Sequence, residues 1–92
     1  MDTRLLTYFT AVAKHQNITH AANALHIAQP ALSVAIKKLE AQLELELFRR
    51  NERKITLTHE GEILLVHAKQ IIQQLDDATL AMKELRGLEK GE

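Results

Sequence analysis

The chain has 92 residues, 46% of them hydrophobic, with three glycines and one proline, and these values favour a single small domain that is mostly helical. Without cysteine, a signal peptide after Met1 or an apolar run of roughly 18 residues, the sequence argues against disulfide-stabilised and membrane-spanning proteins and for a cytoplasmic one. The formal net charge is zero, from 12 basic and 12 acidic residues, which taken alone argues against a nucleic-acid-binding protein.

Residues 2–15 are expected to form the first helix, with Asp2 at its positively polarised start. Apolar side chains recur along it at helical spacing, namely Leu5, Leu6, Phe9, Val12 and Ala13. This stripe predicts a helix that buries one face against the rest of the domain. The polar residues Gln16 and Asn17 interrupt the pattern.

Residues 19–43 are interpreted as a helix-turn-helix, two helices joined by a tight turn. Thr19 is the expected N-cap of the first, because its hydroxyl can accept from the free backbone N–H groups that follow. The small side chains of residues 21–24 let a neighbouring helix come close, and the helix stops around Ile27. Pro30 then marks the start of the second helix, because its fixed φ and missing N–H are tolerated in a first turn.

This second helix, the recognition helix, has two contrasting faces. Its apolar stripe consists of Leu32, Ile36, Leu39 and Leu43. The opposite face is small, polar or basic and carries Pro30, Ser33, Val34, Lys37 and Ala41. A helix that reads base edges in the DNA major groove has this character, and its first turns do the reading. Gln29 and Ser33 are therefore the candidates for base contact.

Residues 43–57 change from helical to alternating periodicity and predict a two-stranded hairpin. Its apolar residues Phe48, Ile55 and Leu57 are expected to pack on the helices. The charged stretch between the two apolar groups, residues 49–54, is expected to face solvent. The hairpin is therefore interpreted as a basic wing.

Charge is unevenly distributed along the chain. Residues 30–58 contain six basic and four acidic groups, whereas residues 59–92 contain four basic and seven acidic groups. The basic candidates for DNA contact are Lys37, Lys38, Arg49, Arg50, Arg53 and Lys54. Such groups bind phosphates with release of counterions; the alternative for them is an ordinary solvated face.

Residues 59–86 predict one long helix, with Thr58 as its cap and Gly61 as a weak point in its first turn. A seven-residue apolar pattern runs over three heptads through Leu64, Ala68, Ile71, Leu75, Ala78, Met82 and Leu85. Three heptads form a longer apolar face than one small domain can cover. We therefore expect this face, the seam, to pack against a second copy of the chain. An intramolecular packing face is the alternative. Residues 87–92 are expected to be a frayed tail.

Metal and catalytic sites are not indicated. The five histidines are His15, His20, His26, His59 and His67. No two of them are four residues apart, and the chain has no cysteine that could complete a metal site with them. Ser33 has no histidine or acid at a spacing that would place a base beside it, and no Gly-rich phosphate loop exists. An enzyme is therefore not expected. The remaining alternative to DNA binding is a coiled-coil protein interaction module, which the zero net charge motivates.

The order of helix, helix-turn-helix, basic wing and long helix resembles the N-terminal DNA-binding region of LysR-type transcriptional regulators. The matching stretches come in the family's spacing and are 6–12 (LTYFTAV), 17–22 (NITHAA), 25–39 (LHIAQPALSVAIKKL), 47–50 (LFRR) and 53–61 (RKITLTHEG). The resemblance implies a mainly α fold: a winged helix-turn-helix at residues 1–58 followed by a linker and dimerisation helix at residues 59–86.

In function, the resemblance implies a bacterial cytoplasmic regulator, associated with the nucleoid when bound, that binds double-stranded DNA as a homodimer on a partly palindromic site. The residues matching Gln29, Pro30 and Ser33 lie against bases or phosphates in the family, and that matching Arg53 reaches a minor groove. The family's small-molecule inducer binds a C-terminal effector-binding domain that is absent here, so no cofactor is expected. A tetramer is the alternative state for the full-length protein.

Four residues depart from the family pattern. Ala28 stands where a serine or threonine often caps the recognition helix, a loss of about 1 kcal/mol. Val34 stands where an arginine is frequent, which removes a possible guanine contact and leaves a methyl-bearing surface. Glu44 replaces a glycine that usually ends this helix, and Glu52 replaces a glycine that is common in the wing. Because both acids are expected near phosphates, nonspecific affinity should be weak.

Overall fold

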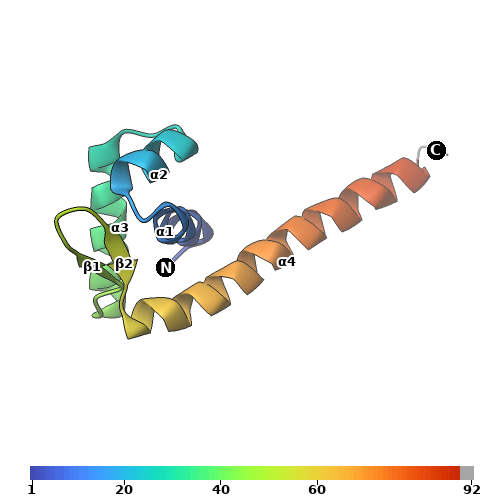
Figure 1. Ribbon diagram of the computed structural model, residues 1–92. Helices are drawn as coiled ribbons and strands as arrows, with labels where there is room; N and C mark the ends of the chain where they lie inside the picture. Colours follow the sequence, from blue (N-terminus) through green and yellow to red (C-terminus); the bar gives the residue numbers. More distant parts are fainter. Residues whose placement is uncertain (90–92) are drawn as a thin grey trace.

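The computed structural model describes residues 1–89, which form four helices and two short strands. In chain order these are α1 (Thr3–His15), α2 (Ile18–Leu25), α3 (Gln29–Leu43), β1 (Phe48–Arg50), β2 (Ile55–Leu57) and α4 (His59–Glu89). We call α1 to α3 with the hairpin the head; α4 projects from it as a single rod (Figure 1). The radius of gyration is consequently 16.0 Å, against about 12 Å for a globular chain of this length. The predicted winged helix-turn-helix with a long following helix is confirmed.

The core of the head lies where its three helices and the hairpin meet. Phe9 and Val12 of α1 are completely inaccessible to solvent. The ring of Phe9 lies against that of Phe48 in β1, with centroids 5.3 Å apart and ring planes tilted by 48°. The other buried hydrophobic residues are Leu5, Leu6, Ala21, Ala22, Leu32, Ile36, Leu39, Leu47, Ile55 and Ala68. The stripes predicted for the first and the recognition helix therefore face this core, with Ala13 and Leu43 half-buried at their ends.

The start of α2 differs from the prediction. Asn17, not Thr19, is the N-cap, because its side-chain oxygen accepts a hydrogen bond from the His20 N–H at 2.8 Å. Thr19 lies inside the first turn and is exposed. Both residue types cap helices well, but a start at Ile18 brings that apolar side chain against the core. The helix also ends before the expected Ile27.

The ends of α1 and α3 show how well each helix is capped. Asp2 is the N-cap of α1 rather than its first residue, and its carboxylate accepts from the Leu5 N–H at 2.8 Å. Ala28 is the N-cap of α3 and makes no side-chain hydrogen bond, as predicted, while Pro30 lies in the first turn. Glu44 ends α3 with a left-handed backbone of φ 56°, a conformation that glycine adopts without strain.

Ala28→Ser is expected to raise the free energy of unfolding by about 1 kcal/mol, because a serine hydroxyl can accept from the Ala31 N–H, which otherwise donates only to the Ala28 carbonyl oxygen at 3.1 Å. Chemical denaturation followed by circular dichroism measures this change. The matched control is Ala24→Ser, at an exposed position inside α2, where serine is slightly unfavourable. An equal gain in both variants would show that capping is not the cause.

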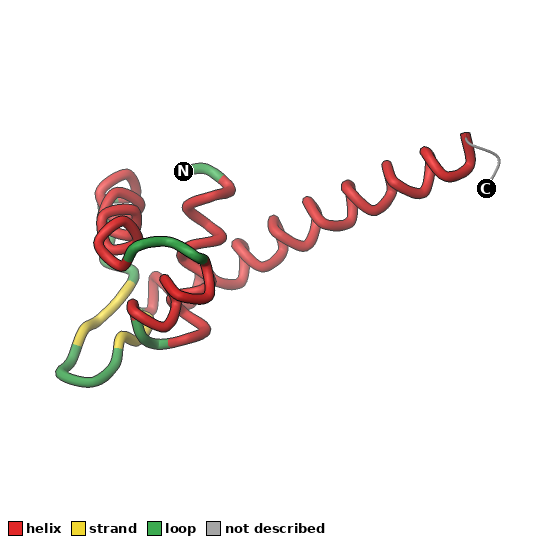
Figure 2. Tube along the Cα trace, turned by 90° about the horizontal axis from the view of Figure 1, so that it is seen from above, coloured by secondary structure: helices red, strands yellow, loops and turns green. Residues whose placement is uncertain are grey.

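The strands β1 and β2 pair antiparallel, with Phe48 opposite Leu57. The hairpin is tied to the α1–α2 turn by a hydrogen bond from the Ile55 N–H to the Gln16 carbonyl oxygen, at 3.1 Å. Its loop, residues 51–54, protrudes from the helices (Figure 2). We call the hairpin with this loop the wing; the predicted packing of its apolar residues and exposure of its tip are confirmed.

The long helix α4 begins as predicted, since the Thr58 hydroxyl accepts from the Gly61 N–H at 3.0 Å. Its first half packs on α1. From residue 73 to residue 86 every side chain is exposed. The helix continues to Glu89, past the expected end at residue 86, and residues 90–92 of the expected tail lie outside the described part.

Gly61 is not the weak point that helix propensity predicted. A Cβ atom at this position would overlap the carbonyl oxygen of Leu47 and lie 2.9 Å from a methyl carbon of Leu57. Glycine therefore allows the first turn of α4 to approach the base of the wing. The close packing at this position leaves no room for a side chain, and glycine is present there despite its low helix propensity.

Candidate nucleic-acid interface

The outer face of α3 is open to solvent, as the sequence predicted. Gln29, Pro30, Val34 and Lys37 are exposed and Ser33 is half-buried. The Gln29 side-chain amide donates to the Ser33 hydroxyl at 3.0 Å. The two residues predicted to contact bases thus form one polar unit at the start of the helix.

The wing presents four exposed basic side chains, Arg49, Arg50, Arg53 and Lys54. Asn51 shapes the loop that carries the last two. Its side-chain oxygen accepts from the backbone N–H groups of Arg53 at 3.2 Å and Lys54 at 2.9 Å, and its own N–H donates to the Lys54 carbonyl oxygen at 3.0 Å. The sequence analysis did not single out Asn51, although an asparagine in a short polar loop is the signal of such a turn.

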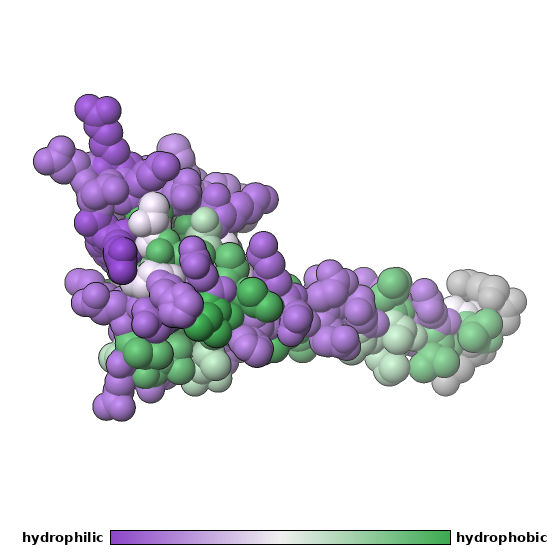
Figure 3. Space-filling view, turned by 60° about the horizontal axis from the view of Figure 1, so that its bottom comes forward, coloured by the Kyte–Doolittle hydropathy of each residue, from purple (hydrophilic) through white to green (hydrophobic). Residues whose placement is uncertain are grey.

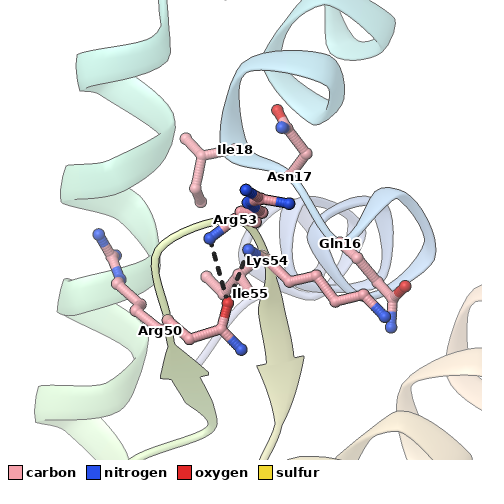
Figure 4. A pocket seen from close by; sticks show the side chains of 8 residues that line it. Gln16, Asn17, Ile18, Arg50, Arg53, Lys54 and Ile55 are labelled. Atoms are coloured by element: carbon pink, nitrogen blue, oxygen red, sulfur yellow. Dashed lines mark hydrogen bonds between the residues drawn. The ribbon is translucent and has the colours of Figure 1, made fainter.

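A recess between the wing and the α1–α2 turn, which we call the wing hollow, gathers basic groups. It is lined by Gln16, Asn17, Ile18, Arg50, Asn51, Arg53, Lys54 and Ile55. Figure 4 shows Arg53 beside Asn17 and Lys54 reaching toward Gln16. Three cations and no carboxylate line this recess, so it is suited to an anionic group. Gln16 and Asn17 were not predicted as site residues, because only the fold brings them to the wing.

A second hollow joins α3 to β1 and brings three predicted residues together, Lys37, Arg49 and Arg50. Two carboxylates, those of Glu40 and Glu46, line it as well. The Glu40 carboxylate is engaged by the backbone, since it accepts from the N–H groups of Leu47 at 2.7 Å and Phe48 at 3.4 Å. It thereby fixes the start of the wing against the recognition helix, and it places Lys37 in one hollow with Arg49 and Arg50, where the exposed Glu46 is the other acid.

Lys38 does not line this hollow. It lies in a separate hollow between α3 and α1, together with Arg4, Tyr8 and Val34. One helical step of about 100° separates it from Lys37, which faces the wing. Of the two adjacent lysines, only Lys37 is placed beside the wing arginines.

The heptad face of α4 divides where the head ends. Leu64 is half-buried and Ala68 is completely buried in the head, so Ala68 has no surface left for a partner and its assignment to a dimer interface is wrong. The remaining members are exposed: Ile71, Leu75, Ala78, Met82 and Leu85. Figure 3 shows hydrophobic surface along the projecting rod. The periodicity continues unchanged through the boundary, so sequence alone does not mark where internal packing stops.

Other kinds of site are not formed by the described residues. Within residues 1–89, no three histidine or acidic side chains come together where a metal ion could be held. None of the helices in this range is long and apolar enough to cross a membrane. A proposed function must therefore account for three features: the outer face of α3, the wing and the exposed heptad positions of α4.

Residues 3–62 match the family described as bacterial regulatory helix-turn-helix protein, lysR family. The chain belongs to the LysR family. The matched region runs from the start of α1 into the first turn of α4 and so contains the whole head. The predicted family is confirmed, and LysR-family members are transcriptional regulators rather than enzymes.

Individual relatives agree with this assignment. The chain is 47% identical over 87 residues to the HTH-type transcriptional regulator BsdA of Bacillus subtilis, covering 94% of this chain and 30% of BsdA. It is 38% identical over 88 residues to the regulator CfxR of Cupriavidus necator, covering 96% and 28% of the two chains. The LysR-family chain thus spans less than a third of the length of these relatives.

Solved structures of DNA-binding domains in complex with DNA show the same fold. The BenM DBD in complex with benA site 1 DNA matches with a TM-score of 0.88 and 36% identity, over 92% of this chain and 96% of that one. The CbnR DBD in a DNA complex matches with a TM-score of 0.86 and 34% identity, over 92% and 98% of the two chains.

Proposed function

We propose that this LysR-family chain binds double-stranded DNA as a homodimer on a partly palindromic site, with α3 in the major groove and the wing at the minor groove. The observation that carries the proposal is the cluster of three cations at the junction of helix and wing: Lys37 of α3 lies in one hollow with Arg49 and Arg50 of the wing. Phosphate contacts from such a cluster position a helix whose first turns meet base edges. The matching BenM and CbnR structures are complexes with DNA, which supports the proposal that this chain binds DNA.

Dimerisation is part of the proposal and rests on α4. Isolated helices are marginal in water unless an apolar face packs on something, and among the described residues 1–89 nothing covers the side chains of α4 from residue 73 to residue 86. Its exposed apolar residues include Leu75, Met82 and Leu85, at 46%, 57% and 52% exposure. A second copy in antiparallel orientation would cover them and set the distance between two heads.

For the whole protein, the proposal is a cytoplasmic regulator, associated with the nucleoid when bound, whose inducer is held by a C-terminal domain outside this chain. This region then needs no cofactor of its own. A tetramer of full-length subunits is compatible with the same dimer contact.

Selection of bound duplexes from a random pool tests the proposed function, followed by gel retardation of the selected duplex at increasing salt. The expected result is enrichment of a partly palindromic site and binding that weakens steeply with salt. The competing function is a coiled-coil interaction module, which the zero net charge favours. Complete absence of retardation at low salt would reject DNA binding in favour of that module.

Arg53→Ala is expected to weaken binding to all duplexes alike and to reduce the slope of log K against log salt concentration by about 1, because one phosphate contact is lost. Filter binding or fluorescence anisotropy over a salt series measures the slope. Lys83→Ala is the matched control, since Lys83 is equally basic and exposed but lies in the far half of α4. An unchanged slope for Arg53→Ala would show that Arg53 makes no phosphate contact.

A further inference from the structure

The outermost point of the recognition helix is an apolar side chain. With 3.6 residues per turn, Val34 lies about 170° around α3 from the centre of the buried stripe, and it is 66% exposed. Gln29 and Ser33 lie on the flank of the helix that also carries Lys37, and Lys38 lies on the other flank. Val34 is therefore on the side of the helix that would face the floor of a groove occupied by α3.

The chemistry of this position restricts what it can face. Valine offers two methyl groups and neither a donor nor an acceptor. In the major groove, thymine is the one base of the four that presents a methyl group, at C5, whereas the other three are distinguished there by their hydrogen-bonding groups. Valine pressed against a donor or acceptor leaves that group unpaired, while valine against a methyl buries apolar surface on both sides.

We propose that Val34 is a specificity-determining residue that selects a thymine in each half-site by contact with its 5-methyl group. This inference rests on the proposed function and adds to it the identity of one recognised base. Two local features favour the contact. A β-branched side chain in a helix has one strongly preferred rotamer, so the methyl groups are held in place. The adjacent Gln29–Ser33 pair, joined at 3.0 Å, supplies the polar groups that fix the register beside it.

Deoxyuridine tests the inference on the DNA side, because it lacks only the methyl group of thymidine and keeps its hydrogen-bonding edge. The unaltered 92-residue chain is titrated with the selected duplex, in which each thymine is replaced in turn by deoxyuridine. At one thymine in each half-site, the substitution is expected to weaken binding about fourfold, the effect of one buried methyl group. Folding is not at issue, since the protein is unchanged.

Val34→Ala then identifies the residue responsible. In this variant the penalty at that thymine is expected to fall below about twofold, because most of the apolar partner has been removed. Leu80→Ala is the matched control: Leu80 is also apolar and exposed, at 56%, but lies on the projecting part of α4, and the fourfold penalty should persist.

The outcomes separate this inference from the proposed function. A selected duplex that binds, but has no thymine whose deoxyuridine penalty depends on Val34, overturns the inference and leaves DNA binding intact. A pool from which no duplex is enriched overturns the proposed function, and the inference fails with it.

Discussion

Gly61→Ala is expected to lower the free energy of unfolding by about 3 kcal/mol or more, a large part of the roughly 5–15 kcal/mol available to a small domain. The added methyl group meets the Leu47 carbonyl oxygen, a backbone atom that cannot rotate away, and a methyl group of Leu57. Relief requires α4 to move away from the base of the wing. That movement would strain the hydrogen bond from the Thr58 N–H to the same Leu47 oxygen, at 2.9 Å.

Urea denaturation followed by circular dichroism measures the effect of Gly61→Ala as a shift of the midpoint. Gly87→Ala is the matched control, because a Cβ atom at Gly87 meets nothing within 4 Å. There, alanine gains helix propensity of up to about 1 kcal/mol, so stability should stay the same or rise. Equal midpoints for the two variants would show that the close approach at Gly61 is not maintained in solution.

Gly61 and Gly87 show the difference between what neighbouring residues predict and what distant contacts require. Helix propensity depends on neighbouring residues and gives both positions the same low value. The requirement at Gly61 comes from Leu47, which lies beyond both strands of the wing in the chain. The same limit applies to Asn17 and Thr19: both are competent caps, and the burial of Ile18 against the core decides between them.

Patterns that repeat along the chain predicted most of the fold. The stripes of α1 and α3 and the alternation in the wing each place several side chains on one side of an element, so a single misplaced residue does not change the result. The heptads of α4 predicted the helix equally well. They did not distinguish Ala68, buried in the head, from Leu75, exposed beyond it, because the difference lies in where the head ends.

The candidate site was predicted by residue type and completed by the fold. The exposure of Val34 follows from its place opposite a buried stripe, and that of the wing arginines from the charged stretch that separates two apolar groups. The role of Glu40 does not, since an acid on a helix facing DNA reads as unfavourable. Its carboxylate instead binds two backbone N–H groups at the start of the wing, which a sequence does not reveal before the wing is positioned.

Leu75→Asp is expected to abolish dimerisation and with it the high-affinity binding of a two-half-site duplex. Leu75 is 46% exposed near the middle of α4 and lines an apolar recess with Ile71, Gln70 and Gln74. In a dimer, the substitution would remove two leucines from the seam and bury two carboxylates without partners, at several kcal/mol. The dissociation constant of the dimer should rise at least about 100-fold.

Sedimentation equilibrium measures the dimer, and circular dichroism checks that the monomer remains folded, as the exposure of Leu75 leads us to expect. Leu80→Asp is the matched control: it places the same charge on the same helix at a position 56% exposed, about 140° around from Leu75 and outside the seam. Dimerisation should survive there. If the unaltered chain sediments as a monomer at high concentration, or if both variants dimerise equally well, the exposed heptad face has another role. Loss of the dimer in Leu75→Asp alone would assign that face to a second copy, and each α3 would then meet DNA with an affinity multiplied by the tethering of its partner.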